Sequence, residues 1–123
     1  MDVVQTDVTQ GLQTFLSRKK VDLIICNPPY VATPEAEYTD SLSERGVTAA
    51  WAGGARGRSM TDQLIGLLPG LLSQRGAAYI VLEQCNGFEA VAELAATKGL
   101  VHETIIKRRA GRELLSVVRI TKS

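Results

Sequence analysis

The chain has 123 residues, 45% of them hydrophobic, which suffices for one compact domain and excludes two. Its 14 Lys and Arg against 13 Asp and Glu give a formal charge of +1, so the overall charge gives no electrostatic reason to expect nucleic acid or an anionic membrane as a partner. No apolar run approaches the length of a membrane span, and the N-terminal "MDVVQTDVTQ" lacks the basic and apolar regions of a signal peptide, which favours a soluble protein of the cytoplasm, with the nucleus as an alternative.

The first predicted elements are a strand, a helix and a second strand. "VVQT" (residues 3–6) is β-rich and is followed by Asp7. A helix is then predicted over residues 9–19, with three apolar side chains on one face: Leu12, Phe15 and Leu16. The run "VDLIIC" (Val21–Cys26) is almost continuously apolar, which is the pattern of a strand covered on both faces in a parallel sheet.

A long irregular segment is predicted over residues 27–58. It carries Pro28, Pro29 and Pro34, a scatter of acidic residues and the glycine-rich "WAGGARGR". Irregular segments of this length in a small domain are usually either functional or disordered.

The next predicted helix begins at Ser59. Ser59 and Asp62 resemble a capping box in which Asp replaces the usual Glu, and the helix that follows carries a leucine-rich face: Leu64, Leu67, Leu68, Leu71 and Leu72. Pro69 should kink this helix or end its regular portion early. After a turn at "SQRG", the run "AAYIVLE" (residues 77–83) is predicted to be another buried strand.

The last third of the sequence predicts a helix and a strand pair. Asn86 is the expected N-cap of a helix that Gly99 ends, with these apolar positions: Phe88, Val91, Leu94 and Ala95. The β-rich runs "VHETIIKRR" (residues 101–109) and "LLSVVRIT" (residues 114–121) are joined by "AGRE". Because this link is too short for a parallel crossover, the two strands should pair antiparallel.

The order βα, βα, βα, ββ predicts an α/β domain with a mostly parallel sheet and a C-terminal antiparallel hairpin. Ligands of such open sheets bind beyond the carboxyl ends of the strands. Asp7 and Asn27 both fall at such ends.

The tetrapeptide "NPPY" (residues 27–30) carries chemistry suited to that position. The Asn27 carboxamide offers an acceptor oxygen, and Pro28 and Pro29 have no N–H and a fixed φ, so they form a rigid frame that can present a carbonyl. A substrate –NH2 group could donate to the Asn27 oxygen and to the Pro28 carbonyl, while Tyr30 supplies a flat apolar face for a planar amide or base.

Such a site orients a weakly nucleophilic nitrogen and needs no strong base, which suits methyl transfer from a sulfonium donor. The alternative is a purely structural role, in which Asn-Pro-Pro only turns the chain after a strand. The place of Asn27 at a strand end, with Asp7 at the preceding one, favours the functional interpretation.

Six stretches together resemble HemK-type protein-glutamine methyltransferases, and most closely the eukaryotic and archaeal HemK2-like subfamily. They are "TDVTQGL", "VDLIICNPPYV", "AAWAGGARGRSMTDQ", "LLSQRG", "TKGL" and "AGRELLSVVRITKS". The tetrapeptide is shared with adenine methyltransferases of DNA and RNA, so "WAGG" followed by "GR" is the more discriminating feature.

The resemblance implies a partial Rossmann-like sheet, S-adenosylmethionine as the cofactor, and methyl transfer to the glutamine side-chain amide in the Gly-Gly-Gln motif of a translation release factor. It implies that Asp7 and Val8 contact the adenine of the cofactor and that Asn27 binds both cofactor and substrate. Pro28, Pro29 and Tyr30 would complete the catalytic pocket for the target amide. A small zinc-binding activator subunit is an expected partner.

One departure from the family pattern concerns the N-terminal half. The family's first strand, its glycine-rich loop and a second strand with a ribose-binding acid are not found, so residues 1–123 are expected to be the C-terminal portion of a class I methyltransferase domain that binds cofactor weakly alone. Gly53, Gly54 and Gly57 follow the "NPPY" strand, and are interpreted as a flexible connection rather than a cofactor cradle.

Two other functions stay open at this point. Adenine methylation in nucleic acid would use the same tetrapeptide, although the near-neutral charge argues against it, and the basic "KRRAGR" (residues 107–112) is interpreted as a solvated turn. A non-catalytic, partner-binding fragment is the second alternative. Cys26 and Cys85 lack CxxC spacing and His102 lacks a second ligand, which argues against a metal site.

Overall fold

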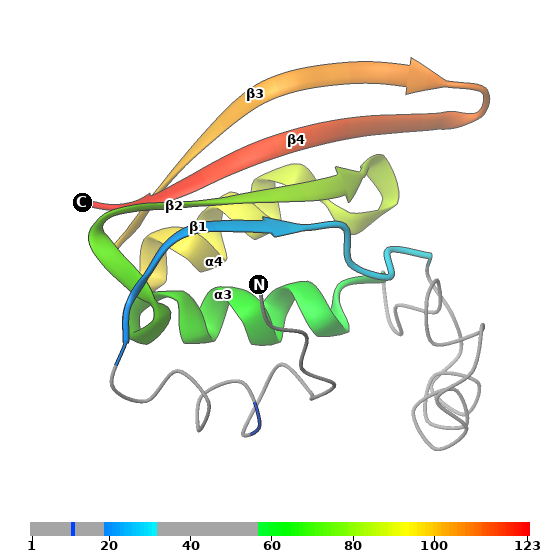
Figure 1. The fold of residues 1–123 in the computed structure, drawn as a ribbon. Coiled ribbons are helices and arrows are strands. Elements are labelled where there is room, and N and C mark those ends of the chain that lie inside the picture. The colour runs from blue at the N-terminus through cyan, green and yellow to red at the C-terminus, as the bar shows by residue number, and fades with distance from the viewer. Residues whose placement is uncertain (1–10, 12–18, 32–56) are drawn as a thin grey trace.

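The computed structural model describes Gly11, residues 19–31 and residues 57–123 (Figure 1). In this part of the chain the order of elements begins with β1 (Val21–Cys26), α3 (Ser59–Leu71), β2 (Leu72–Glu83) and the 3-10 turn η3 (Gln84–Asn86). It ends with α4 (Phe88–Thr97), β3 (Leu100–Ala110) and β4 (Glu113–Lys122). The predicted strand at residues 3–6 and most of the predicted helix at residues 9–19 lie outside the described residues.

The four described strands form one mixed sheet in the order β1-β2-β4-β3. β1 runs parallel to β2, whereas β4 is antiparallel to both β2 and β3. The prediction of a mostly parallel sheet is therefore wrong for the described strands. The reason is that β3 and β4 are joined by a tight turn at Gly111 and Arg112, and β4 then returns beside β2.

Both described helices pack on the same face of the sheet (Figure 1). The leucine-rich face of α3 meets the inward side chains of β2 and β4, and α4 contributes Val91 and Ala95. Between these layers lies the core, whose largest fully buried hydrophobic side chains are Ile65, Leu68, Leu72, Ile80, Leu82, Val91, Val118 and Ile120. Burial of this apolar surface is the main force that holds the helices against the strands.

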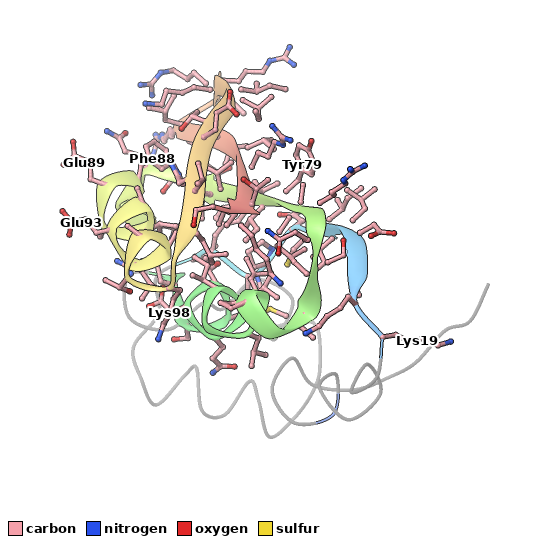
Figure 2. All side chains as sticks on the ribbon, turned by 90° about the vertical axis from the view of Figure 1, so that its left-hand side faces the viewer. Lys19, Tyr79, Phe88, Glu89, Glu93 and Lys98 are labelled. Carbon is pink, nitrogen blue, oxygen red and sulfur yellow. The ribbon has the colours of Figure 1, made fainter. Side chains whose placement is uncertain are left out.

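The opposite face of the sheet carries no described helix. Leu23 and Ile25 on β1 are 55% and 78% exposed, and Ile25 lies beside Tyr79 of β2. Figure 2 shows Tyr79 projecting from the side of the sheet away from the helices. The prediction that Val21–Cys26 is covered on both faces is therefore wrong for the described residues, although the bounds of the strand are confirmed.

The start of α3 differs from the prediction. The helix begins at Ser59 as expected, but no side chain caps it, and Asp62 instead pairs with Arg58, whose Nε and Nη2 both lie 3.1 Å from Asp62 Oδ1. Pro69 lies inside the helix, which continues to Leu71. Because the Pro69 nitrogen carries no hydrogen, the helix passes this residue without the usual hydrogen bond to the Ile65 carbonyl.

The stretch "SQRG", predicted as a turn, lies within β2. The register passes from Val21 opposite Leu72 to Leu23 opposite Ala77. Residues 73–76 of β2 therefore lie opposite the single residue Asp22 and form a large bulge in the strand. Ser73 Oγ donates to Asp22 Oδ1 at 2.5 Å, which ties the bulge to β1. β2 therefore begins five residues before the predicted strand at residue 77.

The end of the chain follows the prediction more closely. The N-cap of α4 is Gly87, with φ of 78°, rather than Asn86, and the helix ends at Thr97 with Gly99 at φ of 72° just beyond it. β3 and β4 pair antiparallel from Leu100 opposite Lys122 to Ala110 opposite Glu113, so the predicted hairpin is confirmed.

Candidate active site

The candidate site lies where the parallel strands β1 and β2 end on the same edge of the sheet. Cys26, the last residue of β1, is opposite Ile80, and β2 continues to Glu83 before turning into η3. The "NPPY" segment that follows β1 therefore lies beside the residues that follow β2. This is the edge at which open α/β sheets bind their ligands.

The four residues of the "NPPY" segment differ in exposure. Asn27 is exposed, Pro28 is buried, and Pro29 and Tyr30 are half-buried. The Asn27 side chain makes no hydrogen bond to another described residue, so its carboxamide can accept and donate to a ligand. Pro28 anchors the segment by its burial, and the exposed amide of Asn27 stands next to it.

Tyr30 is held at both its backbone and its hydroxyl group. Its carbonyl oxygen accepts a 2.9 Å hydrogen bond from Asn86 Nδ2, and its hydroxyl donates to Glu113 Oε2 at 3.1 Å. Partial burial, the hydrogen bond to Glu113 and the neighbouring negative charges raise the pKa of the Tyr30 phenol above its usual value. The phenol is therefore neutral at physiological pH, and its hydrogen bond to Glu113 holds the ring in place.

Asn86 is the buried partner of Tyr30 and is only 1% exposed. Its Oδ1 accepts a 2.8 Å hydrogen bond from the backbone N–H of Glu83, and its Nδ2 also lies 3.4 Å from the carbonyl oxygen of Gly57. One carboxamide thus joins the end of β2, the "NPPY" segment and the residue that leads into α3. The prediction that Asn86 caps α4 is wrong, because its side chain is used in these bonds.

Gly57 lies against the Tyr30 backbone. It has φ of +66°, and a Cβ at this position would fall 1.9 Å from the Tyr30 carbonyl oxygen and 2.8 Å from Asn86 Nδ2. Only glycine permits this approach and this φ without strain. For Gly57, the interpretation as part of a flexible connection is therefore corrected to a close-packing role; Gly53 and Gly54 lie outside the described residues.

Glu83 connects the site to the hairpin. Its Oε2 accepts from the Cys85 N–H at 2.7 Å and its Oε1 accepts from the Leu114 N–H at 3.3 Å. Burial alone would raise the pKa of Glu83, but these backbone hydrogen bonds, with one from Gln84, outweigh it and lower the pKa. Glu83 is therefore a carboxylate that fixes η3 and the start of β4 around Tyr30.

The other residues singled out from the sequence lie elsewhere. Asp7 and Val8, predicted to contact the cofactor, are outside the described residues. Burial raises the pKa of the Cys26 thiol, and this side chain packs on the core. Burial also lowers the pKa of His102, which lies on β3. In the described ranges no group of three His, Cys, Asp or Glu side chains could hold a metal ion, and no described helix is long and apolar enough to cross a membrane.

Four residues of the site were not predicted from the sequence: Gly57, Glu83, Asn86 and Glu113. Asn86 follows a predicted strand at its carboxyl end, so the rule that placed Asn27 in the site could also have placed Asn86 there. Glu113 had no such signal, because its contact with Tyr30 spans 83 residues and depends on the path of the hairpin.

No protein-family model matches the chain. Curated relatives do: Methyltransferase HEMK2 of Homo sapiens is 45% identical over 120 residues, which is 98% of this chain and 54% of the relative. The eRF1 methyltransferase catalytic subunit mtq2 of Schizosaccharomyces pombe is 37% identical over 118 residues, 95% of this chain and 48% of the relative. The chain thus spans about half the length of the curated relatives it matches.

A solved structure shares the fold. It is the E. cuniculi Mtq2–Trm112 complex, responsible for methylation of the eRF1 translation termination factor, with a TM-score of 0.71 and 19% identity over 99% of this chain and 62% of that chain. The described strands and helices therefore have the fold of a methyltransferase. The resemblance to HemK2-type methyltransferases predicted from the sequence motifs is confirmed by these comparisons.

Proposed function

We propose that this chain carries the target-amide side of the active site of an S-adenosylmethionine-dependent protein-glutamine methyltransferase, because it is 45% identical to Methyltransferase HEMK2 over 98% of its length. The observation that carries this proposal is that the "NPPY" segment is held in place while one of its side chains remains exposed. Tyr30 is fixed at its carbonyl and hydroxyl, while the Asn27 carboxamide next to the buried Pro28 is exposed. This is a rigid frame with one free amide-recognition group.

The residues present fit recognition of a glutamine amide. The target –NH2 has two N–H donors, which the Asn27 Oδ1 and the Pro28 carbonyl can accept, and the Tyr30 ring can lie against the plane of the amide. Holding both protons in this way orients the amide nitrogen and favours the positive charge that develops on it during transfer. The proton can leave after the new N–C bond forms.

S-adenosylmethionine, when bound, supplies an electrophilic methyl group to this nitrogen. Of the residues assigned to it, Asn27 is exposed and makes no hydrogen bond to another described residue, which fits a second role in contacting the donor. Asp7 and Val8 are proposed to hold its adenine. The amide side and the cofactor side of the site would then meet at Asn27.

The proposed substrate is the glutamine of the Gly-Gly-Gln motif in a translation release factor. The S. pombe relative is named as the catalytic subunit of an eRF1 methyltransferase, which supports this choice over adenine in nucleic acid. Translation termination occurs in the cytoplasm, where we place the protein, with the nucleus as the alternative.

A small activator subunit is the proposed partner. The solved structure with the same fold is a complex of Mtq2 with Trm112, which supports an activator, and zinc binding by that subunit is part of the proposal. Residues 1–123 are proposed to correspond to the C-terminal portion of a class I methyltransferase domain. We expect this chain alone to bind S-adenosylmethionine with a dissociation constant above the micromolar range. Isothermal titration calorimetry measures this constant.

The experiment that tests the proposed function is methyl transfer from labelled S-adenosylmethionine to a release factor that carries Gly-Gly-Gln. It is run with the chain alone and with the chain joined to the N-terminal segment of the human relative. Asn27→Ala should lower the rate about 100-fold, the usual cost of a lost group that stabilises the transition state. Gln63→Ala removes an exposed carboxamide on α3 and should leave the rate unchanged. Equal rates for wild type and Asn27→Ala would refute the role of Asn27.

A further inference from the structure

Asn86 is a buried carboxamide that the proposed chemistry does not use. It is 1% exposed and lies at the end of η3, just beyond the carboxyl end of β2. A buried amide is costly unless its donors and acceptor are paired, so its retention at this place calls for a role.

Among the described residues, the hydrogen bonds of Asn86 reach three separate segments. Its oxygen accepts from the Glu83 N–H at 2.8 Å, which closes η3 in a reciprocal pair with the Glu83 side chain. Its nitrogen donates to the Tyr30 carbonyl at 2.9 Å and lies 3.4 Å from the Gly57 carbonyl. The oxygen thus serves the local turn, and the nitrogen serves residues 56 and 29 positions away in the sequence.

The bond to Tyr30 matters because it holds the backbone of the "NPPY" segment, whereas the burial of Pro28 and the bond from the Tyr30 hydroxyl to Glu113 hold side chains. Cys26 is the last residue of β1 held by the sheet, and the next described hydrogen bonds of the backbone are those that the Tyr30 carbonyl accepts, from Asn86 Nδ2 at 2.9 Å and from the weaker donor Cys85 Sγ at 3.8 Å. Only three residues lie between these two points. Two of them are prolines, which have a fixed φ and no N–H, so fixing both ends leaves Asn27 little freedom.

We propose that Asn86 is a positioning residue that sets the placement of the Asn27 carboxamide by fixing the Tyr30 carbonyl. This inference rests on the proposed function, because it assigns Asn27 the target amide. Asn86 touches neither substrate nor cofactor and acts through the segment. Its nitrogen supplies the positioning, whereas its oxygen closes η3 through the bond from the Glu83 N–H.

The division between the two atoms of the Asn86 amide suggests the variant to make. Asn86→Asp keeps the oxygen that accepts from Glu83 and replaces the donor by a second oxygen, which repels the carbonyls of Tyr30 and Gly57. The turn should therefore stay closed while the segment is released. Val118→Ala is the matched control, because Val118 is fully buried in β4 and its truncation destabilises the core without touching the segment.

Two readouts are measured at a temperature at which all three proteins are folded. The first is the nuclear magnetic resonance signal of the Asn27 side-chain amide in the 123-residue chain, assigned with Asn27→Ala. The second is kcat and KM in the release-factor methylation assay described above. A residue with a merely structural role would change the melting temperature but neither of these readouts.

We expect Asn86→Asp to shift or broaden the Asn27 signal and to lower kcat about 10- to 100-fold, since small misplacements of a reacting group have effects of this size. The KM for S-adenosylmethionine should change much less, and Val118→Ala should match wild type in both readouts. An unmoved Asn27 signal, or a moved signal with wild-type kcat, would overturn the inference. Wild-type protein that methylates no glutamine would instead refute the proposed function, and the positioning role with it.

Discussion

Tyr30 and the groups around it show how single residues shape the site. The phenol donates to Glu113, the carbonyl accepts from Asn86, and Gly57 lies directly against the Tyr30 backbone. Each contact joins residues that are far apart in the sequence, so the loss of one should change the others. Two substitutions at this scale separate the hydroxyl contact from the backbone contact.

Tyr30→Phe should cost about 0.5 to 1 kcal/mol of unfolding free energy, because it removes one half-buried hydrogen bond and keeps the ring. The folded-state pKa of Tyr30 lies above its usual 10.0, so the phenol's contribution is complete below pH 10 and is lost as pH rises through the folded value. Tyr30→Phe should therefore flatten the alkaline fall in stability, measured by urea unfolding.

The control for that substitution is Tyr79→Phe. Tyr79 lies on the face of the sheet away from the helices, and its hydroxyl makes no hydrogen bond to another described residue (Figure 2). Its stability should stay within about 0.5 kcal/mol of wild type, as surface changes usually do. An equal loss in both variants would argue against the Tyr30–Glu113 bond.

Gly57→Ala should destabilise the protein by about 2 to 4 kcal/mol, because it adds strain at a positive φ to a clash with backbone atoms of Tyr30. Gly66→Ala is the matched control. Gly66 lies in α3 with open space around an added Cβ, so alanine there should stabilise the protein by up to about 1 kcal/mol. Thermal unfolding measures both, and a Gly57→Ala protein that melts like wild type would show that Gly57 does not pack as described.

At the scale of elements, the sequence predicted strand bounds and strand pairing correctly where these depend on hydrophobic periodicity or on the length of a link. It failed where a side chain has several possible hydrogen-bond partners, some of them distant in sequence. The bounds of β1 follow from its apolar run, and the antiparallel pairing of β3 with β4 follows from the short link between them. Asn86 looked like a helix cap because its competing partners, Tyr30 and Gly57, are distant in sequence. The bulge at "SQRG" likewise depends on the register with β1.

The residues of the candidate site also fall into those that the sequence predicted and those that it did not. Asn27 and Tyr30 were predicted from a contiguous tetrapeptide at a strand end, and their neighbours in the fold were not. Glu83 lies at the end of β2 and joins η3 to β4 through its two carboxylate oxygens. Such a connection between elements leaves no local signal in the sequence.

Glu83→Gln tests that connection through its pH dependence. The folded-state pKa of Glu83 lies below its usual 4.5, so its stabilisation is present above pH 4.5 and is lost as pH falls through the folded value. Gln can accept from only one of the two N–H groups with its single oxygen. We therefore expect a loss of about 1 kcal/mol at pH 7 and a shallower decline in acid.

The comparison for Glu83→Gln is Glu93→Gln, which changes an exposed residue of α4 (Figure 2). Urea unfolding between pH 3 and pH 7 should show the wild-type acid decline in Glu93→Gln. If Glu83→Gln kept that decline as well, the carboxylate could not be the group that links η3 to β4.

At the scale of the whole molecule, the described sheet has one face covered by α3 and α4 and one without a described helix. The net charge of the whole chain is +1, but four cationic side chains lie close together in sequence at the tip of the β3–β4 hairpin: Lys107, Arg108, Arg109 and Arg112. The chain spans about half of relatives that are named as methyltransferases. The net charge alone therefore gives no electrostatic reason to expect nucleic acid as a substrate.

Duplex DNA should bind only weakly. With only four cations at the tip of the hairpin, we expect dissociation constants no tighter than about micromolar at physiological salt, the range of non-specific binding. Filter binding over a series of salt concentrations measures this, with Arg108→Gln/Arg109→Gln as the charge-reduced control. Tight, steeply salt-dependent binding that this variant loses would favour the nucleic-acid alternative.

The central claim is that the end of β1 recognises the –NH2 group of a glutamine side chain. Its most direct test is titration of the 15N-labelled chain with a Gly-Gly-Gln peptide and, separately, with a Gly-Gly-Glu peptide, which differs only in replacing that –NH2 by oxygen. The Gln peptide should shift the Asn27 side-chain amide signal and the Glu peptide should not. Equal shifts with both peptides, or shifts that leave Asn27 unchanged, would contradict this account.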